Sequence, residues 1–305
     1  MTEERVTTTP FRMFAVRVAR VQRLSPSFVR ITFTGEDLDL FADNGFDQRI
    51  KLVLPLPGLG LAPLPTGPDW YSAWRSLPEE MRNPVRTYTA GAVRPGLREV
   101  DVDMVLHGET GPASRFAVHA RPGDEAALLG PDATYPGRQG GVEFAPPEGY
   151  RGPLLLAGDE TALPAVAGIL ARLPRESFGR VVLEVPHADD RLDLDAPVGV
   201  EVTWAVRGQD AHGSHLVRLV RQAVSGPGTS DGVGAPAHQG DADEELLWDV
   251  PDPATHHAED GDLYAWLAGE ASTIRAIRRH LVTELGHDRR AVSFMGYWRE
   301  GRAEH

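Results

Sequence analysis

The 305-residue chain contains no cysteine. This absence excludes disulfides, thiolate zinc sites, cysteine-ligated iron–sulfur clusters and a cysteine nucleophile. Lysine is almost absent too, because 30 of the 31 basic residues are arginines and only Lys51 is a lysine. Residues 1–12 lack the apolar core of a secretory signal, and no run approaches the roughly 20 apolar residues of a membrane span. We therefore expect a cytoplasmic protein with no membrane partner.

Basic charge is also scarce where a nucleic-acid-binding protein would concentrate it. The formal net charge is −13, and residues 225–262 alone supply ten Asp or Glu with no Lys or Arg. The rest of the chain is nearly balanced and has no basic stripe that could neutralise phosphates. Hydrophobic residues make up 41% and charged residues 25%, which is typical of a globular protein. The length indicates two domains of about 150 residues each, and we expect a monomer that binds no nucleic acid.

The first half of the chain has the pattern of short β-strands. Six runs rich in β-forming residues, most of them alternating apolar and polar side chains, lie at residues 14–18, 29–33, 50–54, 85–89, 100–106 and 126–129. Six short strands at this spacing favour a small antiparallel barrel. We therefore predict a six-stranded antiparallel β-barrel domain over residues 1–145, with a surface loop at residues 55–68.

The second half alternates buried strands with helices. Strands are predicted at residues 154–156, 181–185, 202–206, 263–267 and 292–298, and helices at 162–173, 215–224 and 273–285. This alternation predicts a parallel sheet with crossover helices, that is, an α/β domain over residues 152–305. The Pro- and Gly-rich residues 136–153 read as a hinge between the domains. Residues 225–262 read as a flexible acidic insertion, in which the adjacent His256 and His257 lack a fixed third ligand for a metal.

One short motif has the chemistry that a flavin requires. A flavin needs an aromatic platform for its ring, a hydrogen-bonding group near N5 and a cation for its phosphates. Arg86, Tyr88 and Thr89, in the sequence RTYT at residues 86–89, supply these three groups. Taken alone, the motif is more typical of an ordinary β-strand that carries a surface arginine.

A second motif follows the next predicted strand. In HGETGPASRFA, residues 107–117, Gly111 permits close backbone approach and Pro112 suits the first turn of a helix. The backbone N–H groups of Ala113 and Ser114 would then face a phosphate at the helix N-terminus. Many strand-to-helix turns look similar, and His107 is equally compatible with a core or capping role.

The two motifs, about 20 residues apart, resemble those of the siderophore-interacting protein family, ferric-siderophore reductases within the ferredoxin reductase-like flavoproteins. The resemblance continues in LAGDETALPA at 156–165, WLAGE at 266–270 and GYWREG at 296–301. It implies a two-domain α/β flavoprotein with FAD bound in the barrel and NADPH or NADH bound by the parallel-sheet domain. It further implies reduction of ferric iron held in a siderophore and release of Fe(II), with ferredoxin as an alternative electron donor.

The resemblance also implies roles for individual residues. The flavin would be held by Arg86, Thr87, Tyr88, Thr89, His107, Thr110, Gly111, Ala113 and Ser114. The nicotinamide side would be formed by Asp159, Glu160, Thr161, Ala162, Gly269 and Glu270. Thr89 and Glu270 would be the catalytic residues at the flavin.

The acidic turn at Asp159 and Glu160 conflicts with a phosphate-binding role. Two carboxylates suit a helix N-terminus electrostatically but would repel a pyrophosphate. We therefore expect this turn to lie near the nicotinamide, with the phosphates bound elsewhere. Arg207, after the strand at 202–206, is a candidate for a 2′-phosphate, although a solvated loop arginine is equally compatible with its position.

An acidic protein needs a local basic patch to attract an anionic ferric siderophore. Lys51 on a barrel strand, and Arg299 with the weaker candidate Arg302 after the last strand, would border the flavin edge between the domains. The alternative is an isolated surface lysine and a frayed terminal arginine. We predict no resident metal, because a siderophore supplies its own iron ligands. Two other functions remain open: a general NAD(P)H:flavin or ferredoxin-coupled oxidoreductase, and a non-catalytic ferri-siderophore binding protein.

Overall fold

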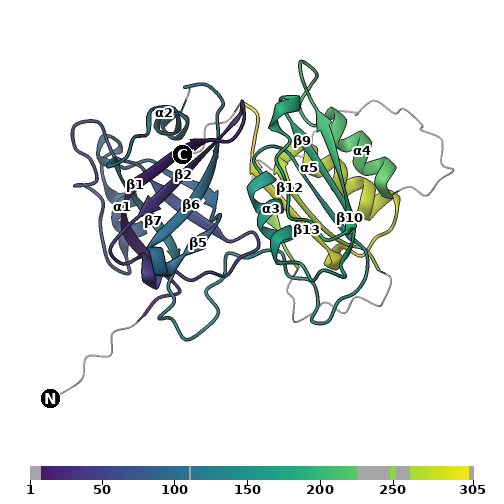
Figure 1. The fold of residues 1–305 in the computed structure, drawn as a ribbon, viewed down its shortest axis with the longest axis horizontal. Helices are drawn as coiled ribbons and strands as arrows, with labels where there is room; N and C mark the ends of the chain where they lie inside the picture. The colour runs from purple at the N-terminus through teal and green to yellow at the C-terminus, as the bar shows by residue number, and fades with distance from the viewer. Residues whose placement is uncertain (1–7, 110, 225–247, 252–261, 302–305) are drawn as a thin grey trace.

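The computed structural model describes residues 8–109, 111–224, 248–251 and 262–301, which form two domains side by side (Figure 1). The N-terminal domain is built around a curled antiparallel sheet, and the C-terminal domain around a sheet flanked by helices. Within these described ranges, none of the helices combines the length and the hydropathy that crossing a bilayer requires.

The N-terminal sheet has seven strands, where the sequence predicted six. Their order is β4-β3-β7-β1-β2-β6-β5, and every neighbouring pair is antiparallel. The strands are β1 (Phe11–Arg23), β2 (Phe28–Thr34), β3 (Arg49–Val53), β4 (Val85–Thr89), β5 (Val93–Arg94), β6 (Glu99–Val105) and β7 (Glu125–Pro131). The additional strand, β5, has two residues, which is too short for an alternating pattern to indicate it.

The chain itself closes this sheet. After β4 pairs with β3 at one sheet edge, the following residues cross to the other edge. There Gly91 N–H donates to Asp101 O (2.8 Å) and Asp101 N–H donates to Ala92 O (3.0 Å), before β5 continues the pairing with β6. The curled sheet therefore has its two edges joined just beyond the RTYT motif.

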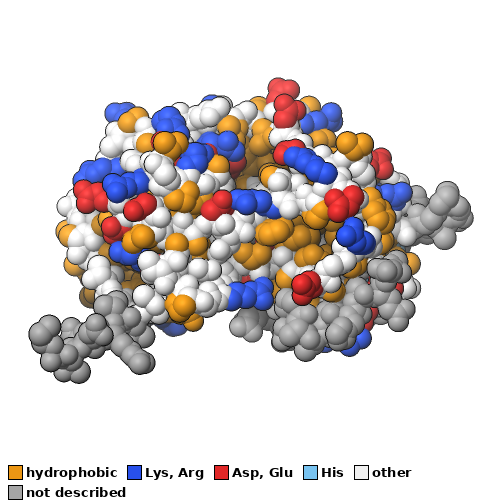
Figure 2. Space-filling view, turned by 60° about the horizontal axis from the view of Figure 1, so that its bottom comes forward, with side chains coloured by type: hydrophobic (Ala, Val, Ile, Leu, Met, Phe, Trp, Pro, Cys, Tyr) orange, Lys and Arg blue, Asp and Glu red, His pale blue; other side chains and the backbone are white. Residues whose placement is uncertain are grey.

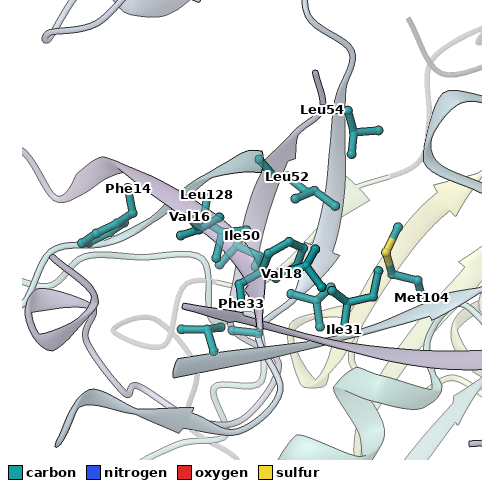
Figure 3. Close-up of a cluster of buried hydrophobic side chains, with 14 of the residues drawn as sticks. Phe14, Val16, Val18, Ile31, Phe33, Ile50, Leu52, Leu54, Met104 and Leu128 are labelled. Carbon is teal, nitrogen blue, oxygen red and sulfur yellow. The ribbon is translucent and has the colours of Figure 1, made fainter. Parts of the chain in front are cut away.

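Alternation along the strands fills the interior of the curled sheet (Figure 3). The labelled side chains, all buried, are Phe14, Val16, Val18, Ile31, Phe33, Ile50, Leu52, Leu54, Met104 and Leu128. Burying each stabilises the fold by roughly 1.5–3 kcal/mol relative to leaving it in water. Helix α2 (Pro112–His119) covers this core through Ala113 and Ala117, whereas α1 (Trp70–Ser76), in the long β3–β4 connection, buries none of its residues.

The C-terminal sheet has the order β10-β9-β8-β12-β13-β11. Its strands are β8 (Leu154–Gly158), β9 (Phe178–Val185), β10 (Gly199–Val206), β11 (Trp248–Asp249), β12 (Tyr264–Glu270) and β13 (Val292–Trp298). Helix α3 (Leu163–Arg172) packs on the face toward the barrel, and α4 (Ser214–Val224) and α5 (Ala271–Arg278) on the other. The prediction of parallel strands is confirmed for five strands, while the edge strand β11 is antiparallel to β13.

Strand β11 lies inside the range predicted as a flexible insertion, residues 225–262. Trp248 lies inside that range, yet its ring stacks on Tyr297 with centroids 5.9 Å apart, and the Arg49 guanidinium lies 4.7 Å from the Trp248 centroid. An aromatic residue with two such neighbours can offset the entropy of ordering a short strand. The remainder of the predicted insertion, residues 225–247 and 252–261, lies outside the described residues, as do His256 and His257.

Residues 136–153, predicted as a hinge, contain no helix or strand but pack into the junction between the domains. The buried Asp47 carboxylate of the barrel domain accepts the Trp266 indole N–H (2.9 Å) and the Phe144 backbone N–H (3.1 Å). In return, buried Asp190 of the C-terminal domain accepts the hydroxyls of Ser25 (2.6 Å) and Ser27 (2.8 Å). Each domain therefore contributes one buried carboxylate that accepts hydrogen bonds from donors of the other domain. Figure 2 shows hydrophobic side chains gathered near the middle of one face, among basic and acidic ones.

Candidate functional site

Strand β4 presents its two pairs of side chains to opposite faces, as alternation predicts. Arg86 and Tyr88 lie opposite the core residues Leu52 and Ile50 of β3, and both are half-buried. Thr87 and Thr89 lie opposite Lys51 and Arg49 on the outer face. The RTYT motif thus divides between the barrel core, against which Tyr88 packs, and an outer face that carries cations.

Lys51 lies on that outer face, and its Nζ donates a hydrogen bond to Thr87 Oγ1 (2.6 Å). Arg49 lies two residues before Lys51 on the same face. Its guanidinium stacks over the Trp248 ring and pairs with the Glu143 carboxylate at 3.2 Å. Sequence reasoning placed Arg49 and Lys51 on one face, which the register confirms, but did not indicate the contact between Arg49 and Trp248. That contact joins segments about 200 residues apart, and no local pattern signals it.

Helix α2 begins with an open N-terminus. Its N-cap residue is Gly111, in an extended conformation with no side chain to accept a hydrogen bond, and Pro112 starts the first turn. The first-turn N–H groups of an α-helix have no partner within the helix, so this turn is suited to a phosphate. Ala113 is buried against the barrel core, Ser114 is half-buried and His107 is exposed. Thr110 lies outside the described residues. The donor set fits the pyrophosphate of FAD.

The predicted nicotinamide turn lies at the carboxyl end of β8, where ligands bind in α/β domains. Asp159 is fully buried, and its Oδ1 accepts the Thr161 N–H (2.9 Å). Its Oδ2 accepts the Glu270 N–H (2.8 Å) and the Trp298 indole N–H (2.9 Å). Burial and the neighbouring Glu160 raise the pKa of Asp159. Three of the predicted motifs, GDET, WLAGE and GYW, therefore meet at one carboxylate.

The second carboxylate of that turn, Glu160, is also buried but is paired. Arg207 binds it with two hydrogen bonds, Nη1 to Oε2 (2.9 Å) and Nη2 to Oε1 (2.8 Å). Arg207 Nη1 also donates to Glu184 (3.1 Å), a buried carboxylate at the end of β9. Burial opposes ionisation of Glu160, but His212 and Arg207 lower its pKa to about 2. Arg207 is thus engaged by two carboxylates with 13% of its side chain exposed, a position that disfavours the predicted 2′-phosphate role.

Sequence reasoning missed His212. Its Nε2 lies 3.5 Å from Glu160 Oε2 and 3.7 Å from Asp159 Oδ2, and its ring meets the Trp298 ring edge-on at 4.8 Å. Burial disfavours the charged form, but the two carboxylates raise the pKa of His212. Together with Arg207, this histidine supplies the positive charge that faces the acidic turn. A loop histidine without a motif gave no signal in the sequence.

Glu270, predicted as catalytic, has a clear local role in the structure. Its carboxylate accepts the Thr273 N–H (2.9 Å) and the Ser272 hydroxyl (2.5 Å), which caps the N-terminus of α5. These bonds lower the pKa of Glu270 although burial opposes it. Its predicted role at the flavin remains a prediction, as does that of Thr89, which is buried at the end of β4.

The predicted substrate residues come from both domains. Lys51 lies on β3, while Arg299 follows β13 directly after Trp298, and its Nη1 is buried without a hydrogen-bond partner. Such a nitrogen is suited to an anionic ligand. Arg302 lies outside the described residues. A separate cleft of about 1020 Å³ beside residues 138–152, lined by Phe46, Phe144 and Leu173, includes none of the predicted site residues.

Family models match both domains. The model of the siderophore-interacting FAD-binding domain matches residues 17–135, and that of the siderophore-interacting protein matches residues 153–301. An uncharacterized protein of Mycobacterium tuberculosis is 34% identical over 96% of this chain and 92% of its own. The ferric vibriobactin reductase ViuB of Vibrio cholerae is 28% identical, covering 93% and 89%. The NADPH-dependent ferric-chelate reductase of Escherichia coli is 26% identical, covering 94% and 93%.

Solved structures share the two-domain arrangement. A siderophore utilization protein from T. fusca superposes with a TM-score of 0.68 at 28% identity, covering 96% of this chain and 95% of that one. The ferredoxin reductase of carbazole 1,9a-dioxygenase superposes with a TM-score of 0.57 at 16% identity, covering 98% and 73%. At that identity the likeness shows the fold alone, which is the ferredoxin reductase-like fold.

Proposed function

The chain belongs to the siderophore-interacting protein family, and from this premise we propose that it reduces ferric siderophores with electrons from NAD(P)H. Its cofactors are FAD and NAD(P)H. The flavin, when bound, converts a two-electron hydride donor into single electrons that ferric iron can accept. Because Fe(II) binds hard oxygen donors more weakly than Fe(III), reduction releases the iron. We place this reaction in the cytoplasm, where the nicotinamide donor is available.

The observation that carries the proposal is the open N-terminus of α2, which packs on the same barrel core as Tyr88 of the RTYT strand. The backbone N–H groups after Gly111 and the Arg86 guanidinium would bind the two phosphates of FAD. Tyr88 would support the flavin ring, and Thr89 would donate a hydrogen bond at its edge. These roles follow the family resemblance, and the half-buried positions of Arg86 and Tyr88 support them.

Lys51 and Arg299 would receive the anionic siderophore, with Arg302 as a third candidate. Support comes from the outer face of β3, where Lys51 lies beside Thr87, and from the buried, unpartnered Nη1 of Arg299. A protein with a formal charge of −13 needs such local cations to bind an anion. We further propose that the protein acts as a monomer, with ferredoxin as an alternative donor.

The test is an anaerobic electron-transfer assay on the purified holoprotein. The flavin should be FAD by mass, should bleach with NADPH or NADH, and should regain its colour when a ferric siderophore is added, while a ferrous chelator traps Fe(II). Lys51→Ala and Arg299→Ala should raise KM for an anionic siderophore, more at low salt, but not for a neutral acceptor. Arg17→Ala, which removes an exposed cation elsewhere on the barrel, is the control. A reduced flavin that is reoxidised by free flavin but not by ferric siderophores would contradict the proposal.

A further inference from the structure

The N-terminus of α2 in the barrel domain has no side-chain cap, whereas carboxylates cap the N-termini of α4 and α5 in the C-terminal domain. In the barrel, the N-terminus of α2 is open because its N-cap is Gly111. In the C-terminal domain, α3, α4 and α5 all begin at the carboxyl edge of the parallel sheet, where a dinucleotide's pyrophosphate would meet a helix N-terminus. At α4 and α5, the chain's own carboxylates occupy the position of the phosphate.

Helix α4 is closed by Glu184, which is fully buried at the end of β9. Its Oε1 accepts the Gly213 N–H (2.8 Å), and its Oε2 accepts the Leu216 N–H (3.0 Å). Both oxygens therefore point at the first turn of α4. A phosphate could reach these donors only by displacing a carboxylate from the protein interior.

Helix α5 is closed in the same way by Glu270, which accepts the Thr273 N–H. Helix α3 has one donor fewer, since its second residue, Pro164, has no N–H. The approach to α3 carries the buried carboxylates of Asp159 and Glu160, and Asp159 already accepts the Thr161 N–H. The N-termini of α4 and α5 are therefore closed to an anion, and the uncapped N-terminus of α3 is preceded by two buried carboxylates.

The charges at this edge act in the same direction. Four buried carboxylates lie at this edge, those of Asp159, Glu160, Glu184 and Glu270. Arg207 pairs with Glu160 and Glu184, and His212 lies 3.7 Å from Asp159 and 3.5 Å from Glu160. The Arg207 guanidinium donates its hydrogen bonds to Glu160 and Glu184. The edge therefore repels a phosphate-rich ligand, while it tolerates the uncharged or cationic nicotinamide ring.

We propose that the C-terminal domain recognises the nicotinamide mononucleotide half of its electron donor and leaves the ADP half, with or without a 2′-phosphate, unbound. The inference rests on the proposed function, since it names the class of donor for that reductase. The donor class is then any reduced nicotinamide nucleotide, of which the mononucleotide is the smallest member.

The experiment compares donors on the holoenzyme. Reduced nicotinamide mononucleotide, NADH and NADPH are each mixed anaerobically with the oxidised enzyme, and flavin bleaching is followed. The three values of kcat/KM should agree within about threefold. Calorimetric titration of the holoenzyme with ADP-ribose and 2′-phospho-ADP-ribose should show no binding at millimolar concentration.

The opposite result overturns the inference. A dinucleotide favoured by about tenfold or more over the mononucleotide, or calorimetric binding of either ADP-ribose, would show that a phosphate or adenosine site exists. If that preference disappears in Arg299→Ala, then Arg299 is that site. A flavin that no reduced nicotinamide bleaches also overturns it. Failure of the proposed function is seen separately, as a dithionite-reduced enzyme that ferric siderophores do not reoxidise.

A variant tests the physical cause. Glu160→Gln removes the charge that holds Arg207, so KM for NADPH should fall by about threefold or more while KM for the mononucleotide stays constant. Glu176→Gln, an exposed carboxylate paired with Arg151, is the matched control and should change neither. An unchanged KM for NADPH in Glu160→Gln would mean that this carboxylate does not exclude phosphates, and the inference would fall.

Discussion

At the scale of single residues, the buried carboxylate of Asp159 limits which residue position 269 can hold. Gly269 has φ +145, and a Cβ there would lie 2.6 Å from Asp159 Oδ2. The glycine of the WLAGE motif is therefore required by a backbone conformation and by a close approach, before any role in catalysis is considered.

Gly269→Ala should consequently destabilise the protein. The strained backbone alone costs about 1–3 kcal/mol, and the clash with Asp159 adds to it, so thermal melting should shift clearly downward. Gly208→Ala is the matched control, because Gly208 also has positive φ (+59) but no atom within 4 Å of its Cβ. Equal shifts for the two variants would mean that the contact with Asp159 is unimportant.

Asp47 predicts a dependence of stability on pH. Burial raises its pKa to about 6, although the N–H groups of Phe144 and Trp266 oppose this. Because the folded-state pKa lies above the unfolded value near 3.9, Asp47 contributes stability below about pH 4 that is lost as pH rises to about 6. The loss amounts to about 3 kcal/mol.

Asp47→Asn should remove that dependence. Between about pH 4 and 6, the free energy of unfolding of the wild type should fall relative to the variant, and the difference should stay constant above. Denaturant unfolding at a series of pH values measures this difference in the free energy of unfolding. Parallel curves for the two proteins would show that Asp47 ionises freely in the folded state.

At the scale of elements, the strongly patterned strands and helices were predictable and the short ones were not. Period-two alternation located the strands that build the barrel core, and the apolar runs located β8, β9, β10, β12 and β13. Strands β5 and β11 have two residues each, too few for an alternating pattern to indicate them, and β11 forms through pairing with β13, more than 40 residues away in the chain. For the same reason, motifs indicated candidate site residues, whereas His212 and Glu184 carried no signal in the sequence.

Helix α2 allows the stability of an element and its proposed ligand binding to be separated. Gly111 has an extended backbone (φ −124, ψ 164) with open space at its Cβ, so Gly111→Asp can be accommodated. An aspartate there caps the helix and should leave the apoprotein at least as stable, by a few tenths of a kcal/mol. The same carboxylate should weaken FAD binding by about tenfold or more through repulsion of the pyrophosphate.

Flavin fluorescence titration and apoprotein melting together check this prediction. Gly111→Asn supplies a neutral cap of similar shape and should weaken FAD binding less than the aspartate does. If FAD affinity is the same in both variants, the charge is irrelevant and the phosphates do not bind at α2.

At the scale of the whole molecule, the domains are held together by buried polar contacts as well as by apolar packing. Asp190 receives hydrogen bonds from Ser25 Oγ, Ser27 N–H and Ser27 Oγ across the junction, and from His187 N–H of its own domain. Removing it leaves buried donors of the barrel domain without an acceptor.

Asp190→Ala should therefore weaken the junction by about 3 kcal/mol and separate the melting of the two domains. Differential scanning calorimetry of the holoprotein should show a single transition in the wild type and two in the variant. Asp195→Ala, which removes an exposed pair with Arg175, should melt as the wild type does. A single transition at an unchanged temperature for Asp190→Ala would show that apolar contacts alone couple the domains.

The reciprocity of Asp47 and Asp190 limits how such chains can recombine. A gene that gained a barrel domain from one parent and an α/β domain from another would inherit each carboxylate without its donors. Burying Asp47 without the indole of Trp266, or Asp190 without Ser25 and Ser27, would leave an uncompensated charge at the new junction. Functional chimaeras should therefore exchange the Asp47–Trp266 and Ser25–Ser27–Asp190 sets together, so that the heritable unit is the junction as well as the domain.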